Sequence, residues 1–292
     1  MYVGNSTRKV RTFQRPQVAK ITAPLPEPSH VLEDLLSRRS VRWLLGRITV
    51  LDPDGRCFFE RLCENYDRGG QPGLERFKWA FFTALINRGL RKARLDREVM
   101  KKKLFHHPPT ARALALTARS IARYGLTIPQ RFVAPLFVVW NFTQACNLSC
   151  RHCYQNSAHK PAPDELSLRE RLDLVDQMAD AGVPFLAIAG GEPLISPDLW
   201  PTLQQAHRRG IQLNLATNGT LLTPHNVARL KEAGVTYVEV SVDSLDPAQH
   251  DVFRGQRGAW ARSIQGIRNS VAGGMRTGLA ACFTRDTIHL AD

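Results

Sequence analysis

The sequence predicts an α/β fold with a parallel sheet, preceded by a basic and mostly helical domain. After Ala134, short runs of β-forming residues alternate with amphipathic helical segments, which is typical of parallel strands joined by right-handed crossovers. Residues 1–134 carry 26 Lys and Arg against 11 Asp and Glu, whereas residues 135–292 carry 14 against 15. Charge and pattern change together, which indicates a domain boundary there.

The overall composition excludes several classes of protein. With 43% hydrophobic and 23% charged residues among 292, the chain is neither disordered nor collagen-like. No apolar run reaches the roughly 18–20 residues of a membrane-spanning helix. The basic segment Met1–Lys20 lacks the apolar stretch of a secretory signal. We therefore expect a reducing, cytoplasmic compartment.

Three segments are expected along the chain. Residues 1–30 contain four prolines and scattered basic residues, which favour an irregular lead. Residues 31–133 form the basic helical domain, with a long amphipathic stretch over Gly73–Leu104. Pro108 and Pro109 are expected to stop that stretch before a further helix over Ala111–Arg123. Residues 134–292 form the α/β domain.

The α/β domain has five strand candidates separated by marked helix starts. Ser167 and Glu170 have the spacing of a capping box, and Ser196, Thr223 and Asp246 each precede a proline suited to the first helical position. The expected strands are Leu136–Phe142, Pro184–Ala189, Gln212–Ala216, Tyr237–Val242 and Thr277–Phe283.

Unusual residues follow the first four strands directly. Active sites of parallel α/β folds lie at the carboxyl ends of the strands, so these residues are expected to share one rim. They are Cys146, Cys150 and Cys153, then Gly190–Pro193, then Thr217–Gly219, then Asp243 and Ser244.

The three cysteines of the first rim segment point to a metal centre. Cys146, Cys150 and Cys153 have the spacing C-x-x-x-C-x-x-C, and soft thiolates select iron–sulfur clusters, zinc or copper. Three protein ligands leave one position open for a small molecule. His152 is adjacent to Cys153 and is an awkward fourth ligand for zinc. The alternative is three buried structural cysteines.

These residues resemble the radical S-adenosylmethionine (SAM) superfamily. The joint occurrence of C-x-x-x-C-x-x-C after the first strand and Gly190–Pro193 (GGEP) after the second carries the resemblance, from about Ala134 onward. It implies a partial (β/α) barrel and a [4Fe–4S] cluster on Cys146, Cys150 and Cys153. It also implies SAM chelated by the open iron and split to a 5′-deoxyadenosyl radical that abstracts hydrogen from a substrate.

The resemblance also implies contacts to SAM. Gly190, Gly191, Glu192 and Pro193 are assigned to the methionyl amino end, the two glycines letting the backbone approach the ligand and Glu192 accepting from the ammonium group. A tight strand-end turn is the alternative for this segment.

Five more residues are candidate SAM contacts. Ser241 and Asp243 lie where related enzymes place ribose contacts, and a solvated strand end is the alternative. Asn218 is either a contact or part of a turn. Arg254 pairs either with a carboxylate in the site or in a surface salt bridge. Tyr154 packs either against adenine or against the cysteine loop.

The sequence phrases are most similar to the branch that modifies peptides or tetrapyrroles. CNLSCRHCY, GGEPL and LATNGTLL carry this similarity. It implies a peptide or tetrapyrrole substrate and a reducing partner such as ferredoxin or flavodoxin. About five of six barrel units are expected, with the core truncated after the fifth strand, which puts the activity of this chain alone in doubt. The alternative function is a non-catalytic iron–sulfur or zinc protein, such as an electron carrier or redox sensor.

The basic domain lies outside the resemblance. Its charge suits nucleic acid, an anionic membrane through Trp79–Phe82, or an acidic substrate, and a solvated basic surface is the alternative. Cys57 and Cys63 are expected in the core of this domain. Cys282, placed inside the fifth strand, is expected as a small buried residue.

Overall fold

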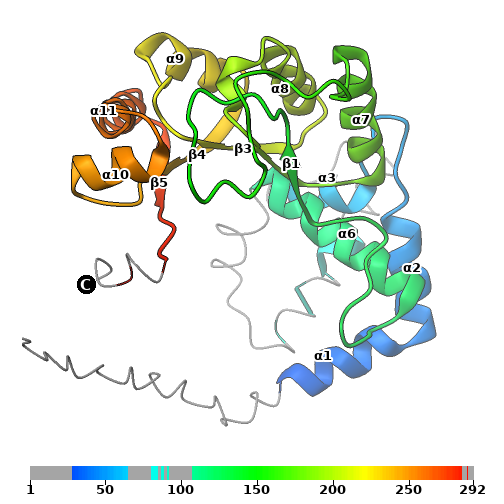
Figure 1. Ribbon diagram of the computed structural model, residues 1–292. Coiled ribbons are helices and arrows are strands. Elements are labelled where there is room, and N and C mark those ends of the chain that lie inside the picture. The colour runs from blue at the N-terminus through cyan, green and yellow to red at the C-terminus, as the bar shows by residue number, and fades with distance from the viewer. Residues whose placement is uncertain are drawn as a thin grey trace, which may run out of the picture.

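The computed structural model describes residues 28–64, 80–84, 87–88, 91, 107–284 and 288. A five-stranded parallel sheet dominates it, with helices on one face and a helical layer at one end (Figure 1). The elements of the helical layer are α1 (Pro28–Ser37), α2 (Arg39–Ile48), α3 (Phe58–Glu64) and α6 (Pro108–Tyr124). Those that follow are β1 (Phe137–Asn141), α7 (Leu168–Ala181), β2 (Phe185–Ala189), η2 (Pro193–Ile195), α8 (Leu199–Arg208), β3 (Gln212–Thr217), α9 (Pro224–Glu232), β4 (Val235–Ser241), α10 (Pro247–Arg254), α11 (Ala259–Ala272) and β5 (Arg276–Ala280).

The sheet has the order β1-β2-β3-β4-β5, and every neighbouring pair is parallel. Each connection must therefore cross back over the sheet, and helices α7, α8, α9 and α11 do so on the same face (Figure 1). Alternate residues of the central strands, such as Leu186, Leu213 and Val238, are fully buried under these helices. The sheet does not close, so the predicted partial (β/α) barrel of five units is confirmed.

Three of the four predicted helix starts are confirmed. Ser167 and Glu170 form a complete capping box, while Thr223 and Asp246 accept backbone N–H groups at the starts of α9 and α10. The prediction for Ser196 is wrong, because that residue ends the short helix η2 and Asp198 precedes α8.

The predicted ends of the last two strands differ from the structure. Strand β4 begins two residues earlier than predicted, at Val235, and β5 ends at Ala280 rather than Phe283. Beyond Ala280 the backbone no longer pairs with β4, because the N–H of Cys282 donates to the Asp243 carboxylate at 2.9 Å. Cys282 therefore lies after the strand and is exposed, so the prediction of a buried residue is wrong.

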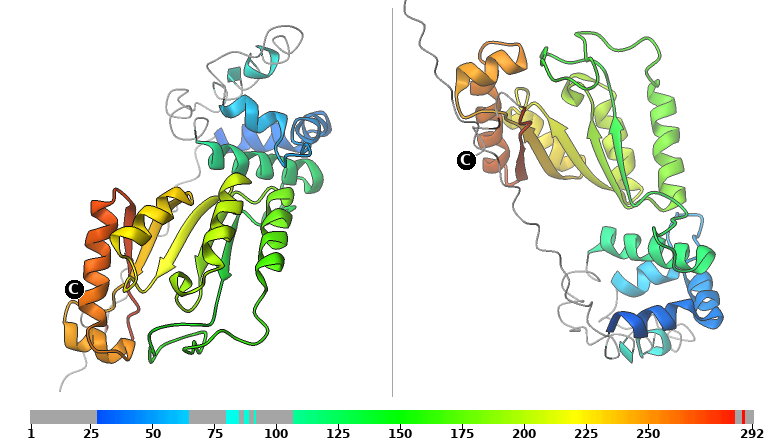
Figure 2. Two further views of the ribbon diagram at one scale, coloured as in Figure 1. Left: turned by 90° about the horizontal axis from the view of Figure 1, so that it is seen from above. Right: turned by 60° about the horizontal axis from the view of Figure 1, so that its bottom comes forward.

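The helices α1, α2, α3 and α6 pack at the end of the sheet where the strands begin (Figure 2). The buried Arg112 of α6 joins the two layers by donating to the carbonyl oxygens of Gly55, Ala179 and Arg209, at 3.4, 2.6 and 2.7 Å. Ala179 and Arg209 lie near the carboxyl ends of α7 and α8, where carbonyl groups lack helical partners. The helical layer is thus fixed to the end of the sheet where the strands begin, opposite their carboxyl ends.

Other predictions for the basic domain have mixed outcomes. The helix expected over Ala111–Arg123 is confirmed as α6, which begins three residues earlier because Pro108 and Pro109 form its first turn, where a missing N–H costs nothing. Cys57 and Cys63 are buried, as predicted. The helix expected over Gly73–Leu104 and the irregular lead fall mostly outside the described residues. The boundaries 1–30, 31–133 and 134–292 stay predictions. Among the described helices, none is long and apolar enough to cross a membrane.

Candidate active site

A cavity of about 440 Å³ opens at the carboxyl ends of the strands. The ends of β2, β3, β4 and β5 contribute to its wall together with the cysteine loop that follows β1, as expected where parallel strands meet one edge. Its lining includes Cys146, Cys150, His152, Cys153, Tyr154, Gly190, Gly191, Asn218, Ser241, Asp243, Arg254 and Cys282.

The loop that carries the three cysteines is held by backbone hydrogen bonds at both ends. At its start, the N–H of Cys146 donates to the Ala158 carbonyl at 2.7 Å. Further along, the N–H groups of Ser149 and Arg151 donate to the carbonyls of Arg254 and Phe253, at 3.2 and 3.0 Å. These last two partners end α10, so a distant helix fixes the shape of the loop.

Each cysteine sulfur accepts hydrogen bonds. The N–H groups of Leu148 and Ser157 donate to the sulfurs of Cys146 and Cys153, at 3.4 and 3.3 Å. The guanidinium group of Arg254 donates to the Cys150 sulfur at 3.8 Å. Burial raises the pKa of the Cys146 and Cys150 thiols. Burial also acts to raise the pKa of Cys153, but hydrogen bonds from Ser157 and its neighbours outweigh it and lower that pKa.

These thiols fit a cubane cluster in their chemistry. They are soft donors on one loop, they line one cavity, and N–H groups stabilise the charge of the thiolate form. In the part of the chain that the structure describes, no three His, Cys, Asp or Glu side chains surround a point as one metal ion requires. Thiolates that each bind a different iron need not share one point.

The glycine turn after β2 packs against the start of the cysteine loop. The N–H groups of Gly191 and Glu192 donate to the carbonyls of Thr143 and Ala145, at 2.7 and 2.8 Å. A Cβ at Gly190 would approach the Thr143 oxygen to 2.7 Å, and one at Gly191 would overlap the Ala145 carbonyl. Gly190 also has a φ of 125°, which glycine adopts most readily. The glycines are thus required by contact between two loops, and not only by approach to a ligand.

Glu192 lies beneath the cavity wall rather than in it. Its carboxylate is fully buried and accepts from the Thr217 hydroxyl, the Asn218 N–H and the Leu194 N–H, at 2.8, 2.8 and 3.2 Å. Burial raises its pKa to about 7, although these hydrogen bonds act to lower it. Glu192 and Pro193 are not among the residues that line the cavity, and the contact of this segment with an ammonium group stays a prediction.

Asp243 and Arg254 form a buried ion pair in the cavity wall. The Nε of Arg254 lies 2.6 Å from the Asp243 carboxylate, and their side chains are 10% and 3% exposed. The alternative of a surface salt bridge for Arg254 is therefore wrong. The same carboxylate accepts from Cys282, while the Asp243 N–H donates to His250 Nδ1 at 3.3 Å. Asp243 thus joins the ends of β4 and β5 to α10.

The remaining candidate residues also lie at the cavity, but they differ in exposure and in the contacts that hold them. Asn218 donates to Asn147 of the cysteine loop at 2.8 Å, which ties the end of β3 to that loop. Ser241 lines the cavity from β4. Tyr154 is 74% exposed, and its hydroxyl donates to Asn141 at 2.9 Å, so it packs little against the loop.

Sequence reasoning missed two contributors to this wall. His152 stacks on Phe253 with ring centroids 4.2 Å apart, and Cys282 lines the cavity from beyond β5. The His152 signal was present in the sequence as a ring within the cysteine motif, but its partner lies about a hundred residues away. No short sequence pattern around Cys282 predicts that it lines the cavity.

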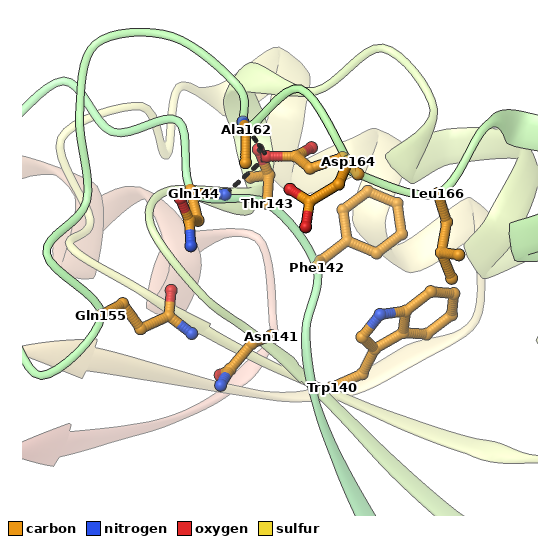
Figure 3. Close-up of a pocket in the computed structure, with 10 residues that line it drawn as sticks. Trp140, Asn141, Phe142, Thr143, Gln144, Gln155, Ala162, Asp164 and Leu166 are labelled. Carbon is orange, nitrogen blue, oxygen red and sulfur yellow. Dashed lines mark hydrogen bonds between the residues drawn. The ribbon is translucent and has the colours of Figure 1, made fainter.

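A second cavity, of about 350 Å³, lies beside β1 and is lined by Trp140, Phe142 and the polar residues around Thr143 (Figure 3). The carboxylate of Glu165 also lines this cavity. It accepts from the Thr143 hydroxyl and from the N–H groups of Gln144 and Ala162, at 2.9, 2.8 and 3.1 Å. Glu165 therefore shapes the loop between β1 and the cysteines. No thiol lines this cavity, and the candidate site remains the one at the strand ends.

Comparison with known proteins finds a matching family and similar curated proteins. The family model of the radical SAM superfamily matches residues 140–289. The AdoMet-dependent heme synthase of Nitratidesulfovibrio vulgaris is 35% identical over 152 residues, 52% of this chain and 41% of that protein. The mycofactocin maturase MftC of Mycobacterium ulcerans is 34% identical over 141 residues, 48% of this chain and 38% of that protein.

A solved structure shows the same fold. The crystal structure of Streptococcus suis SuiB bound to S-adenosylmethionine aligns with a TM-score of 0.53 at 19% identity, covering 83% of this chain and 52% of that one. The chain thus spans about half, or less, of the lengths of the proteins it matches.

Proposed function

The chain belongs to the radical SAM superfamily, and on that premise we propose that Cys146, Cys150 and Cys153 hold a [4Fe–4S] cluster. With SAM on its open iron, such a cluster supplies the electron that splits the sulfonium bond, giving a 5′-deoxyadenosyl radical that abstracts hydrogen from a substrate. The observation that carries the proposal is the single cavity shared by three thiols, the glycine turn and a buried ion pair.

The residues of the chain have distinct parts in this proposal. The cysteine loop presents the thiols, and the glycine turn fixes its start through the bonds to Thr143 and Ala145. Gly190, Asn218, Ser241 and Asp243 form the wall that SAM would meet. Tyr154 would lie at the mouth of the cavity. Glu192 supports the turn from below, because its carboxylate is already fully hydrogen-bonded within the protein.

We propose a carboxylated tetrapyrrole as the first substrate class, supported by the heme synthase at 35% identity. A peptide is the second candidate, supported by the mycofactocin maturase at 34% identity. Porphyrin binding changes the Soret absorbance, whereas peptide binding is followed by calorimetry. If the reconstituted chain binds neither a tetrapyrrole nor a peptide, the substrate proposal is contradicted and the cluster proposal stands.

The cluster proposal is tested by reconstitution. The full chain, incubated with iron and sulfide without oxygen, is expected to turn brown and to release 5′-deoxyadenosine or methionine when SAM and dithionite are added. Cys282→Ala is the matched control, because its thiol lies in the same cavity but outside the motif. A cluster that forms and never reacts with SAM would contradict catalysis and favour an electron carrier or redox sensor. One zinc and no iron uptake would favour a zinc protein.

We also propose a reducing partner such as ferredoxin or flavodoxin, because the family's chemistry needs one low-potential electron for each SAM cleaved. A cytoplasmic location would suit this, since Cys146, Cys150 and Cys153 are free thiols that cluster assembly requires in reduced form. Reduction of the cluster by either protein, measured by paramagnetic resonance, tests the partner.

A groove between α2 and α6 supports an anionic partner for the helical layer. The groove encloses about 540 Å³, and five arginines and the exposed Trp43 line it. Nucleic acid and an anionic membrane are the two candidates, since both present closely spaced phosphates. Binding to RNA, to DNA and to phosphatidylserine vesicles at rising salt separates them. Absence of binding to all three at low salt would contradict this proposal and favour a solvated basic surface.

A further inference from the structure

The last turn of α10 makes a set of contacts with the cysteine loop that no other helix repeats among the described residues. The carbonyls of Phe253 and Arg254 accept N–H groups of the loop, and the Phe253 ring stacks on His152. At the next residue, Gly255, a Cβ would overlap the Ser149 carbonyl, so the helix end and the loop are in direct backbone contact. The position of this turn therefore fixes the position of its side chains relative to the thiols.

Arg254 uses this position to join a thiol to a carboxylate. Its Nη1 donates to the Cys150 sulfur at 3.8 Å, and its Nε lies 2.6 Å from the Asp243 carboxylate. The sulfurs of Cys146 and Cys153 accept from neutral backbone N–H groups instead. Cys150 is thus the one thiol of the three with a full positive charge at its sulfur, and that charge is almost completely withdrawn from water.

We propose that Arg254 is a positioning residue that raises the reduction potential of the cluster through the Cys150 sulfur, with Asp243 as the ion-pair partner whose negative charge offsets part of this effect. This inference rests on the proposed function, since it requires the three thiols to hold a cluster. Arg254 neither binds iron nor touches the reacting atoms in it.

The physical reason is electrostatic. Reduction adds one negative charge to the cluster and its thiolates, and a nearby cation stabilises that charge more strongly in a buried setting than in water. Hydrogen bonds to ligand sulfurs act in the same direction. Asp243 has the opposite effect on the cluster, because its own negative charge offsets part of that of Arg254. The two side chains should therefore shift the potential with opposite signs.

The test is a redox titration of the reconstituted full chain, followed by paramagnetic resonance without SAM, so that no turnover is measured. Arg254→Gln is expected to lower the midpoint potential by roughly 59 mV, which corresponds to a tenfold less favourable one-electron reduction. Asp243→Asn is expected to raise it. Arg257→Gln is the matched control, because this arginine is three residues away and exposed, and it should leave the potential unchanged.

Each outcome decides the inference. The inference is overturned if the cluster of the Arg254→Gln variant has the same midpoint potential as that of the unmodified chain. It is also overturned if Asp243→Asn lowers the midpoint potential. If Arg254→Gln binds no iron, the Asp243→Asn variant decides alone, and an unchanged potential in it overturns the inference. If the unmodified chain itself forms no cluster, the proposed function and this inference fail together. A cluster without potential shifts overturns only the role of Arg254.

Discussion

Two groups of cysteines lie at opposite ends of the strands and differ in the groups that surround their sulfurs. Cys57 and Cys63 are buried in the helical layer, and burial together with the charge of Glu60 raises the pKa of Cys57 to about 12. Burial likewise raises the pKa of Cys63. At the other end, the thiols of the cysteine loop line a cavity and accept N–H hydrogen bonds.

The difference teaches that surroundings, rather than the thiol itself, decide what a cysteine does here. A thiol surrounded by apolar groups and a carboxylate stays protonated and packs as a small hydrophobic side chain. N–H donors and a guanidinium act in the opposite direction, towards the thiolate, although only at Cys153 do hydrogen bonds outweigh burial and lower the pKa. The buried arginines show the same contrast: Arg112 satisfies backbone carbonyls, whereas Arg254 joins a thiol to a carboxylate.

The largest expected effect separates the two groups of cysteines. Cys150→Ala should remove almost all iron after reconstitution, because the remaining two thiols cannot hold a cubane core. Cys63→Ala should keep the iron content of the unmodified chain and lose about 1 kcal/mol of unfolding free energy from the small cavity. Iron analysis and urea unfolding measure both. Equal loss of iron in the two variants would break the comparison.

The next effect concerns pH and the buried Glu192. Its folded-state pKa of about 7 lies above the ordinary value of 4.5, so the folded chain binds this proton more tightly than the unfolded chain. Stability from this group is therefore fully present below pH 4.5 and is lost as pH rises to about 7. The loss is on the order of 3 kcal/mol.

Glu192→Gln tests that pH dependence directly. Urea unfolding at pH 5 and pH 8 should show a smaller difference between the two pH values in the variant than in the unmodified chain. The exposed Glu232→Gln serves as the control. An unchanged pH difference in Glu192→Gln would show that the buried carboxylate does not titrate in this range.

A smaller effect on stability is expected at Arg112, at the end of the sheet where the strands begin. Arg112→Met should cost about 2 kcal/mol of unfolding free energy, because the carbonyls of Gly55, Ala179 and Arg209 each lose one donor. The exposed Arg208→Met is the control and should change stability little. Iron content after reconstitution should stay unchanged in both variants. Loss of iron in Arg112→Met would mean that the two ends are coupled more strongly than the contacts indicate.

The smallest effect is expected at the start of α7, which follows the cysteine loop in the chain. Ser167→Ala removes the side chain that accepts the Glu170 N–H and should cost about 1 kcal/mol. Thermal unfolding measures the loss, and Ser37→Ala, at an exposed helix end, is the control. Iron content should again be unaffected, which sharpens the distinction between local stability and the cluster site. A fall in iron content would contradict it.

Local signals in the sequence predicted the strand–helix alternation and the helix starts at Ser167, Thr223 and Asp246, because caps act over three or four residues. The rim of cysteines and glycines was predicted by topology, since parallel strands bring their carboxyl ends together. The burial of Glu192 could not be predicted, because its partners Thr217 and Asn218 lie on the next strand.

Other features depended on contacts that no short pattern contains. The buried pairing of Arg254 required Asp243 to be enclosed by the end of β5 and by α10. Cys282 looked like a strand residue because its neighbours are apolar, and only the hydrogen bond of its N–H to Asp243 takes it out of the sheet. Pro108 and Pro109 were ambiguous because proline both ends helices and begins them.

The partnership of Cys150 with Arg254 spans 104 positions in the chain, which has a consequence for biosynthesis. During translation the three thiols leave the ribosome well before β4 and α10 have been made, and until then the cysteine loop lacks two of its backbone acceptors. A nascent chain would therefore present unshaped, oxidisable sulfur for the time needed to synthesise about a third of its length. Iron delivery is best timed after that interval, when the receiving loop has acquired its final form.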